Sequence, residues 1–473
     1  MATKRLVLGE WLPDQPGLTG AVTRAKNVVP VMNGYGAFPS AQIFSNNAAE
    51  NLLTVVAGKF GDSVQLFAPS ATKIFKFDPN DLDLDDVSKV GGYTSSITWK
   101  FVQFGKVIIG ANGNNILQAW TIGTSTAWAD LNASAPTARF ITVVRDFVVA
   151  ANETSEPNRV YWSDINDETN WTSGPTSQSD FQDIADGGNI QGLTGGEYGL
   201  VLLEKAIYRM SYIGSPLFFQ FDAISRTLGC YEANSIIQKG SLTFFLSDDG
   251  FYVCDGQNVT PIGAEKVNRW FFDDVDEGNI DKMSTAIDPE RNIVAWCYPN
   301  TNGGRSIIAY NWQTSRWSYA ITTVNFIANA ATVGTTLEQL DIYTSLEGVP
   351  ASLDSRLWAG GKPLFAGVRG AEIVLFGGLP MEPQLISGDI EEGMQSIAKT
   401  ALPQIDGGSA DIAVASRFRL DEDVVFGSDV SATNENRVSL RSVGRYHRVR
   451  VKPTGNWTTV MAIDLELQPV GGR

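Results

Sequence analysis

Short apolar runs recur along the chain from about residue 50 to residue 345. Two apolar runs flank a tight turn and an aromatic-rich run follows, as in WKFVQFGKVIIGANGNNILQAW from Trp99. Runs of this length, rich in β-branched and aromatic residues and bounded by turn residues, predict short β-strands. The predicted turns lie at Gly105, Asp146, Gly199, Gly240 and Pro289 to Asn292.

These units repeat about every 40 to 50 residues, the spacing of β-propeller blades. Short strands cannot bury both faces alone, and stacking four-stranded units around an axis supplies the missing contacts. We therefore expect a mostly β fold with a β-propeller at residues 46–345. An irregular β-sandwich with accidental spacing is the alternative.

The segments on either side of the predicted propeller have other patterns. Proline and glycine break residues 1–45 into short extended pieces, which predicts an arm that orders against another chain or against its own C-terminal domain. Residues 346–473 predict a second β domain, a platform completed by the arm. Within it, the strands at 437–453 and 460–470 are expected to pair as a hairpin across the PTGNW turn.

Charge narrows the possible partners. The 473 residues include 52 Asp and Glu against 36 Lys and Arg, a formal net charge of −16. Broad affinity for nucleic acid needs clustered cations and is therefore not expected. An acidic wall repels phosphate, however, and would let a DNA duplex slide past without sticking, provided that the acidic residues face it.

The N-terminal sequence and the cysteines indicate where the chain is made and whether it contains disulfides. The N-terminus has no apolar stretch typical of a signal peptide, and no apolar run is long enough to cross a bilayer. We expect synthesis in the cytoplasm and no membrane insertion. Cys230, Cys254 and Cys297 lie far apart in apolar runs, which favours buried thiols over disulfides.

Residues for histidine or metal chemistry are scarce. His447 is the single histidine, which excludes a multi-histidine metal site, and we expect a neutral, structural imidazole in a strand. The acidic run DPNDLDLDD at 78–86 partly matches the spacing of calcium ligands. It lacks the glycine and the final glutamate of such a loop, which favours a solvated acidic turn. No metal and no cofactor are expected.

A propeller glycosidase is the enzymatic alternative, because pairs of carboxylates could act as acid and nucleophile. These pairs lie at predicted turns, where aspartate is common, and SDDGF from Ser247 is one residue shorter than the Asp-box of sialidase blades. We therefore expect no catalytic residue and no enzyme. The pairs are Asp164 with Asp167, Asp248 with Asp249, and Asp273 with Asp274.

Three stretches resemble one family of proteins. They are GEWLPDQPGLTGAVTRAKNVVPVMNGYGAFPS at 9–40, RVYWSDINDETNW at 159–171 and SVGRYHRVRVKPTGNWTTVMAIDLELQPVGGR at 442–473. The family is that of the tail hub or nozzle proteins of short-tailed, double-stranded DNA bacteriophages, also called packaged-DNA stabilisation, head-closure or tail accessory proteins. In the opening stretch the resemblance lies in Leu12 with Pro13, Asn27 with Pro30, and Gly34 with Tyr35.

The resemblance implies a structural virion protein of the tail. Copies of the chain, expected to be six, would form a ring below the portal and its adaptor, retain the packaged genome and provide the channel through which DNA leaves. Tail fibres or a tail needle would attach nearby. A distal receptor-binding or fibre protein is a second non-enzymatic alternative, since propeller loops rich in Trp and Asp can bind sugar.

Two groups of residues are candidate contacts with a neighbouring subunit or the adaptor. In the arm, the large side chains of Trp11, Leu12, Tyr35 and Phe38 are expected to act as anchors. In the C-terminal domain, a dense cationic run is expected to pair with acidic patches on a neighbour, with a solvated strand face as the alternative. Its members are Arg437, Arg441, Arg445, Arg448, Arg450 and Lys452.

Overall fold

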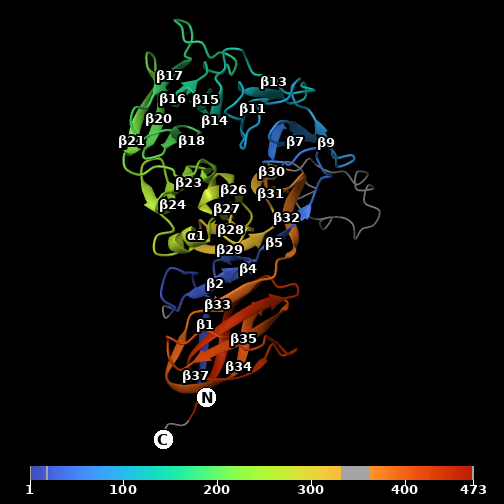
Figure 1. Ribbon diagram of the computed structural model, residues 1–473, viewed down its shortest axis with the longest axis vertical. Helices are drawn as coiled ribbons and strands as arrows, with labels where there is room; N and C mark the ends of the chain where they lie inside the picture. Colours follow the sequence, from blue (N-terminus) through green and yellow to red (C-terminus); the bar gives the residue numbers. More distant parts are fainter. Residues whose placement is uncertain (1, 18–19, 332–362, 471–473) are drawn as a thin grey trace.

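The computed structural model describes residues 2–17, 20–331 and 363–470. Strands make up 56% of the described residues and helices 4%, so the expected mostly β class is confirmed. The molecule is elongated, with a β-propeller at one end and a second β domain, which holds both termini, at the other (Figure 1). None of the helices in the described part has the length and apolar character needed to cross a bilayer.

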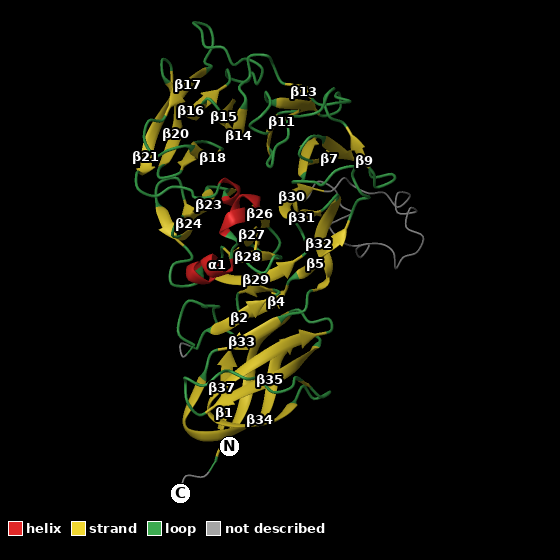
Figure 2. Ribbon diagram, in the orientation of Figure 1, coloured by secondary structure: helices red, strands yellow, loops and turns green. Residues whose placement is uncertain are grey.

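Six separate four-stranded antiparallel sheets form blades of the propeller (Figure 2). The first three comprise β6 (Val56–Phe60), β7 (Ser63–Pro69), β8 (Ile74–Phe77) and β9 (Leu84–Asp86); β10 (Lys100–Phe104), β11 (Val107–Ala111), β12 (Gln118–Thr121) and β13 (Ala129–Asp130); and β14 (Ala138–Val144), β15 (Phe147–Glu153), β16 (Glu156–Trp162) and β17 (Asp180–Asp183). The next two comprise β18 (Ile190–Thr194), β19 (Gly199–Leu203), β20 (Ile207–Gly214) and β21 (Phe218–Ser225); and β22 (Ile237–Lys239), β23 (Leu242–Ser247), β24 (Gly250–Cys254) and β25 (Val259–Pro261).

The sixth separate sheet joins distant parts of the chain. It comprises β30 (Phe326–Ala331), β31 (Pro363–Arg369), β32 (Glu372–Pro380) and, as its outer strand, β5 (Pro39–Ile43). The predicted propeller boundaries are therefore corrected. The boundary at 45/46 excludes β5, and the boundary at 345/346 lies outside the described residues, yet β31 and β32 beyond it still belong to a blade.

Another four-stranded unit completes the ring and is shared with the second domain. It comprises β26 (Ser284–Asp288), β27 (Ile293–Pro299), β28 (Arg305–Asn311) and β29 (Arg316–Thr322). Strand β26 packs between β22 and β30. Side chains fasten it on both sides, because Ser284 Oγ accepts the Ile327 N–H at 2.8 Å and Thr285 Oγ1 donates to the Ile236 carbonyl at 3.4 Å.

Hairpin turns follow the sequence prediction at most positions. The turns at Gly105 and Gly240 have φ of 56° and 61°, and Arg145 in the Asp146 turn has φ of 52°. Gly199 is an exception, because it lies in β19 and the turn precedes it. A Cβ at Gly199 would approach Val144 of the neighbouring blade to 2.9 Å, so this glycine serves close packing between blades.

Apolar side chains between neighbouring blades hold the ring together. The described residues contain seven separate core clusters, most of which join one blade to the next. Between the first two blades, Phe67 lies 4.9 Å from Trp120 and 5.4 Å from Trp128, measured between ring centroids. Such edge-to-face pairs add to the free energy of apolar burial. Trp120, in the aromatic-rich third run of its unit, is therefore part of the core.

A 14-stranded sheet runs from the propeller into the second domain, where it has the order β29-β2-β33-β37-β34-β38-β4-β3. Strand β1 adds to β38, and β35 with β36 adds to β37. The strands are β1 (Ala2–Val7), β2 (Val22–Lys26), β3 (Val28–Val31), β4 (Gly34–Ala37), β33 (Gln384–Ser387), β34 (Ile390–Asp406), β35 (Ser409–Arg417), β36 (Val430–Ser431), β37 (Val438–Thr454) and β38 (Thr459–Pro469). The helices are η1 (Ala233–Ser235), α1 (Asn268–Asp274) and η2 (Glu277–Lys282).

The predicted hairpin of the last two strands is wrong. Strand β34 lies between β37 and β38, and its Ala398 is paired with Ser442 on one side and Leu467 on the other. This arrangement is possible because β34 is 17 residues long and offers both edges. The loop after β37 contains the buried Trp457 and crosses to the far edge of β34 instead of folding back.

Candidate functional site

The predicted arm is part of this chain's own fold, the second of the two alternatives. Strands β1 and β4 pair with β38, and β2 pairs with β33 and β29. The carboxylate of Asp14 accepts the N–H groups of Arg269 and Trp270, both at 2.9 Å, and so caps the first turn of α1. The arm thereby fastens the propeller to the second domain.

Trp11 is fully buried at this junction. Its ring centroid lies 4.8 Å from that of Trp270 and 5.1 Å from that of Tyr319, and its indole N–H donates to the Thr23 carbonyl at 3.3 Å. Leu12, the next residue, is only half-buried. The expectation that Trp11 anchors another chain is therefore corrected, because this chain already encloses its side chain.

Tyr35 and Phe38 are also enclosed within the chain. The Tyr35 hydroxyl donates to the Gly9 carbonyl at 2.9 Å, and the guanidinium of Arg316 lies 4.9 Å from the ring centroid. Burial raises the pKa of Tyr35 well above its ordinary value, so the hydroxyl stays a donor. Phe38 packs against Phe376 at 6.1 Å. Neither side chain is available to a neighbouring subunit.

The cationic run lies on β37, and its acidic partners belong to the same chain. Asp389, whose side chain is 3% exposed, accepts from Arg448 and Arg417 at 2.6 Å each. Asp429 pairs with Arg450 at 2.7 Å and with Lys452 at 2.9 Å. Removing either carboxylate would leave two neighbouring cations uncompensated.

The remaining members of the run are more exposed. Arg445 pairs with Glu391 at 2.6 Å, and Arg437 approaches Glu466 at 3.6 Å. Arg441 is exposed and has no ion pair within the described residues. The expectation of acidic partners on a neighbour is thus corrected for the enclosed Arg448 and Arg450. The half-exposed Arg437 and Arg445, and Arg441 without an ion pair among the described residues, remain candidates for an outside contact.

The single histidine lies in a buried hydroxyl network in the second domain. His447 is fully buried, with Nε2 2.8 Å from Ser396 Oγ and Nδ1 2.7 Å from Ser416 Oγ. Ser442 Oγ donates to Ser416 Oγ at 2.6 Å. Because the imidazole is enclosed between β34 and β35, we interpret it as a structural link between strands.

The candidate carboxylate pairs of a glycosidase lie in different parts of the propeller. Hydrogen bonds from backbone N–H groups, including that of Gln178, outweigh partial burial and lower the pKa of Asp164. Asp249 accepts the Tyr252 hydroxyl at 2.7 Å, and Asp274 in α1 accepts the Tyr298 hydroxyl at 2.9 Å. At least one carboxylate of each pair therefore has a local structural contact at a turn or a helix end.

Thiols and acidic side chains do not gather into a site among the described residues. Cys230, Cys254 and Cys297 are buried and free, as expected, and burial raises the pKa of Cys230 to about 12 and that of Cys297 to about 11. No group of three or more His, Cys, Asp or Glu side chains that could hold a metal occurs in this described part.

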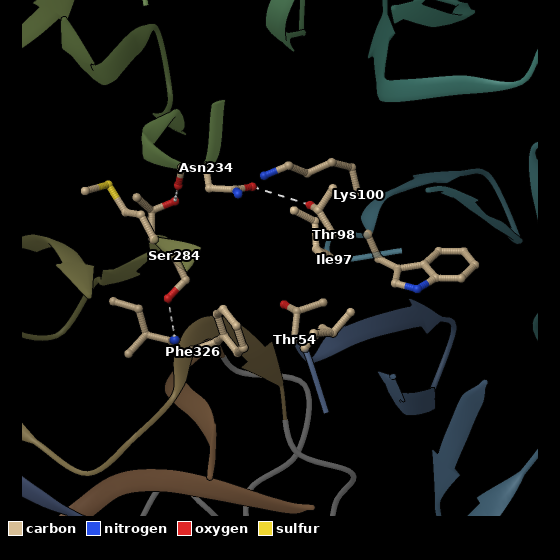
Figure 3. Close-up of a pocket in the computed structure, with 12 residues that line it drawn as sticks. Thr54, Ile97, Thr98, Lys100, Asn234, Ser284 and Phe326 are labelled. Atoms are coloured by element: carbon tan, nitrogen blue, oxygen red, sulfur yellow. Dashed lines mark hydrogen bonds between the residues drawn. The ribbon is translucent and has the colours of Figure 1, made fainter. Parts of the chain in front are cut away.

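A pocket at the centre of the propeller was not expected from the sequence. Its walls come from the beginnings of inner strands and the loops before them, with Thr54, Thr98, Asn234 and Ser284 as polar lining (Figure 3). Lys100, at the beginning of β10, extends over this space toward Asn234 (Figure 3). Burial lowers the pKa of Lys100 to about 8, against a smaller opposing effect of Glu232.

The sequence contains only a weak signal for this pocket. Thr54, Thr98 and Ser284 are common residue types. The sequence alone does not show which positions of a blade face the propeller axis, so nothing singles these three out. Lys100 stands out only slightly, as a lysine at the first position of an apolar strand.

No protein-family model and no curated protein matches the chain. Similar solved structures include a chain of the mitotic checkpoint complex (10% identity, TM-score 0.40, covering 74% of this chain and 96% of that chain). Others are the Pan2 WD40 domain of Neurospora crassa (9%, 0.39, 70% and 90%) and YCF48 bound to a D1 peptide (8%, 0.40, 74% and 98%). The likeness concerns the fold alone.

Proposed function

We propose that this chain is a non-enzymatic structural subunit of the tail hub or nozzle of a short-tailed, double-stranded DNA bacteriophage. Several copies, expected to be six, form a ring below the portal and its adaptor. The DNA passes through this ring, and fibres or a needle attach to it. The chain would be made in the host cytoplasm and become part of the virion tail.

One observation carries the proposal. The opening and closing stretches that resemble this family, 9–40 and 442–473, lie at opposite ends of the sequence, yet they meet in one sheet. Strand β4 with Tyr35 pairs with β38, where Tyr35 is opposite Val460 and Gly36 is opposite Thr459. These two stretches thus share one sheet, whereas the middle stretch, 159–171, lies in the propeller from β16 onward.

The second domain is the part that we assign to ring and adaptor contacts. It is joined to the propeller by a continuous sheet, so a force on one end is transmitted to the other without a flexible linker. The net charge of −16 per chain, repeated around a ring, would repel the phosphates of passing DNA where acidic side chains face the channel. Arg441, an exposed cation on β37 with no ion pair among the described residues, is the first candidate for a contact with an acidic neighbour.

The test is negative-stain imaging with mass determination of the purified chain, alone and mixed with the portal and adaptor complex of the same phage. Rings on the adaptor are expected. An Arg441→Glu variant should form fewer rings, whereas a Lys106→Glu variant, changed at an exposed hairpin of the propeller, should assemble as the unaltered chain does.

A chain that stays monomeric and ignores the adaptor would overturn the proposal. Saturable binding of host surface glycans by such a monomer would instead support a distal receptor-binding protein, and glycan hydrolysis would support a glycosidase.

A further inference from the structure

The pocket on the propeller axis contains a positive charge that the described residues leave unpaired. Lys100 has no hydrogen bond and no ion pair within the described part of the chain, and its side chain extends into the pocket (Figure 3). Arg139, on the inner strand β14 of the next blade, has no ion pair there either, and its charge further lowers the pKa of Lys100. An ammonium group out of bulk water is costly unless an anion or several acceptors accompany it.

The nearest acidic group does not fill this role. Glu232 is 8% exposed and makes no ion pair with Lys100, and its carboxylate accepts the backbone N–H of Asn234 at 2.9 Å. Burial raises the pKa of Glu232. The described residues that line the pocket include no aspartate or glutamate.

Hydroxyl groups on the opposite walls add hydrogen-bond donors. The Ser284 hydroxyl accepts the Ile327 N–H at 2.8 Å and can donate its own proton either to the nearby Cys297 thiol or to a ligand in the pocket. The Thr54 hydroxyl lines the same pocket and has no hydrogen-bond partner among the described residues. A cation with several hydroxyl donors around a small space is the arrangement that suits an oxyanion.

We propose that the pocket binds a small oxyanion, with Lys100 as the charged contact and the hydroxyls of Thr54 and Ser284 as further donors. The oxyanion would bridge inner strands of separate blades, because Lys100 comes from β10, Ser284 from β26 and Thr54 from the segment before β6. Binding would therefore tighten the centre of the ring. The inference does not depend on the proposed tail function.

The test is calorimetric titration of inorganic phosphate into the full chain in a buffer free of other oxyanions, with acetate titrated in parallel. The Lys100→Met variant keeps the length of the side chain and removes its charge, and we expect its dissociation constant for phosphate to rise by about tenfold or more. Lys106→Met, at the exposed turn after the same strand, is the matched control and should bind as the unaltered chain does.

Acetate distinguishes two sources of the oxyanion. Phosphate binding that is tighter than acetate binding supports a free phosphate or phosphate ester as the ligand, whereas equal binding supports a carboxylate. Thr54→Val should weaken either ligand, and it provides a second variant if Lys100→Met does not give a folded chain. No binding by the unaltered chain, or equal affinity of the folded Lys100→Met variant, would overturn the proposal and leave Lys100 as a hydrated lysine.

Discussion

Lys100 makes the free energy of unfolding depend on pH. Its pKa is lowered to about 8, first by burial and then by Arg139, while Glu232 and Cys230 act in the opposite direction. In the unfolded chain its pKa returns to about 10.4. Between these two values the unfolded state holds more protons, so this lysine contributes stability that increases as the pH rises from about 8 to about 10. Below pH 8 the charged ammonium destabilises the fold.

We therefore predict that Lys100→Met increases the free energy of unfolding at pH 7 by about 1–3 kcal/mol in a buffer without oxyanions. Urea denaturation at pH 7 measures the change, and Lys106→Met serves as the control for loss of an exposed lysine. The advantage of the variant should shrink as the pH approaches 10. Equal stability at pH 7 would show that the ammonium is well solvated in the channel.

For a substitution of Trp11 we predict a loss of stability rather than a gain. Trp11→Ala removes a fully buried ring from its contacts with Trp270 and Tyr319, and we expect the free energy of unfolding to fall by about 3–5 kcal/mol. Leu12→Ala, at the neighbouring half-buried position, should cost clearly less. Thermal unfolding of both variants measures the difference. Similar losses in the two variants would mean that the ring of Trp11 is not enclosed as described.

At the level of elements, Asp389 holds the beginning of β34 to two strands. It pairs with Arg448 on β37 and Arg417 on β35, and its backbone N–H donates to the Gly17 carbonyl of the arm at 2.8 Å. Asp389→Asn leaves two guanidinium groups beside a neutral side chain and should lower the free energy of unfolding by about 3–5 kcal/mol.

An exposed ion pair provides the control for this substitution. Asp421 and Arg419 are 64% and 73% exposed, so Asp421→Asn should change stability by less than about 1 kcal/mol. If both variants unfold at the same denaturant concentration, the Asp389 cluster is as well solvated as the surface pair.

The contacts of the N-terminal segment allow a prediction about a chain that lacks it. Its strands supply the outer strand of a blade and the edge and centre of the shared sheet, and it caps α1 through Asp14. Deletion of residues 1–45 should therefore prevent the whole chain from folding, rather than leave an intact propeller that fails to assemble. Soluble expression, circular dichroism and limited proteolysis of the truncated chain measure this, and a compact, protease-resistant propeller would contradict it.

Local signals explain which elements could be predicted. A two-residue turn such as that at Gly105 depends on its own sequence, so hairpins and the repeating blade pattern were visible in the chain. The closure of a blade by β5 joins residues more than 300 positions apart, as in the pairing of Ile43 with Val374, and no local pattern encodes that choice. For the same reason Trp11 was recognised as an anchor but its partner was not.

The ion pairs, too, could not be predicted from local sequence. The arginines of β37 alternate along the sequence and were easy to find, but Asp389 and Asp429 lie in segments that only the folded sheet brings beside them. The axial pocket is even harder to predict from the sequence, because its polar residues come one or two at a time from separate blades and lie together only in the closed ring.

On the scale of the whole molecule, the propeller and the second domain share one core. The largest hydrophobic cluster contains Trp296 and Trp317 of the blade formed by β26–β29 together with Val451 and Ile463 of the second domain. When two domains are joined only by a linker, one of them can unfold while the other stays folded. Here the sheet, the N-terminal arm and the hydrophobic core all cross the boundary between the propeller and the second domain.

The shared core leads to a prediction about cooperativity. Separating the domains would expose apolar surface of both and break the β29-β2-β33 pairing, so partial unfolding should be costly, and the chain should unfold in one transition despite its length. Calorimetry measures it through the ratio of the calorimetric to the van't Hoff enthalpy, expected near one. Trp11→Ala, which weakens the junction itself, should broaden this transition or split it, whereas Lys106→Met should not. Two resolved transitions in the unaltered chain would mean that the continuous sheet does not couple the domains, and the rigid connection that we assign to the ring subunit would be lost with it.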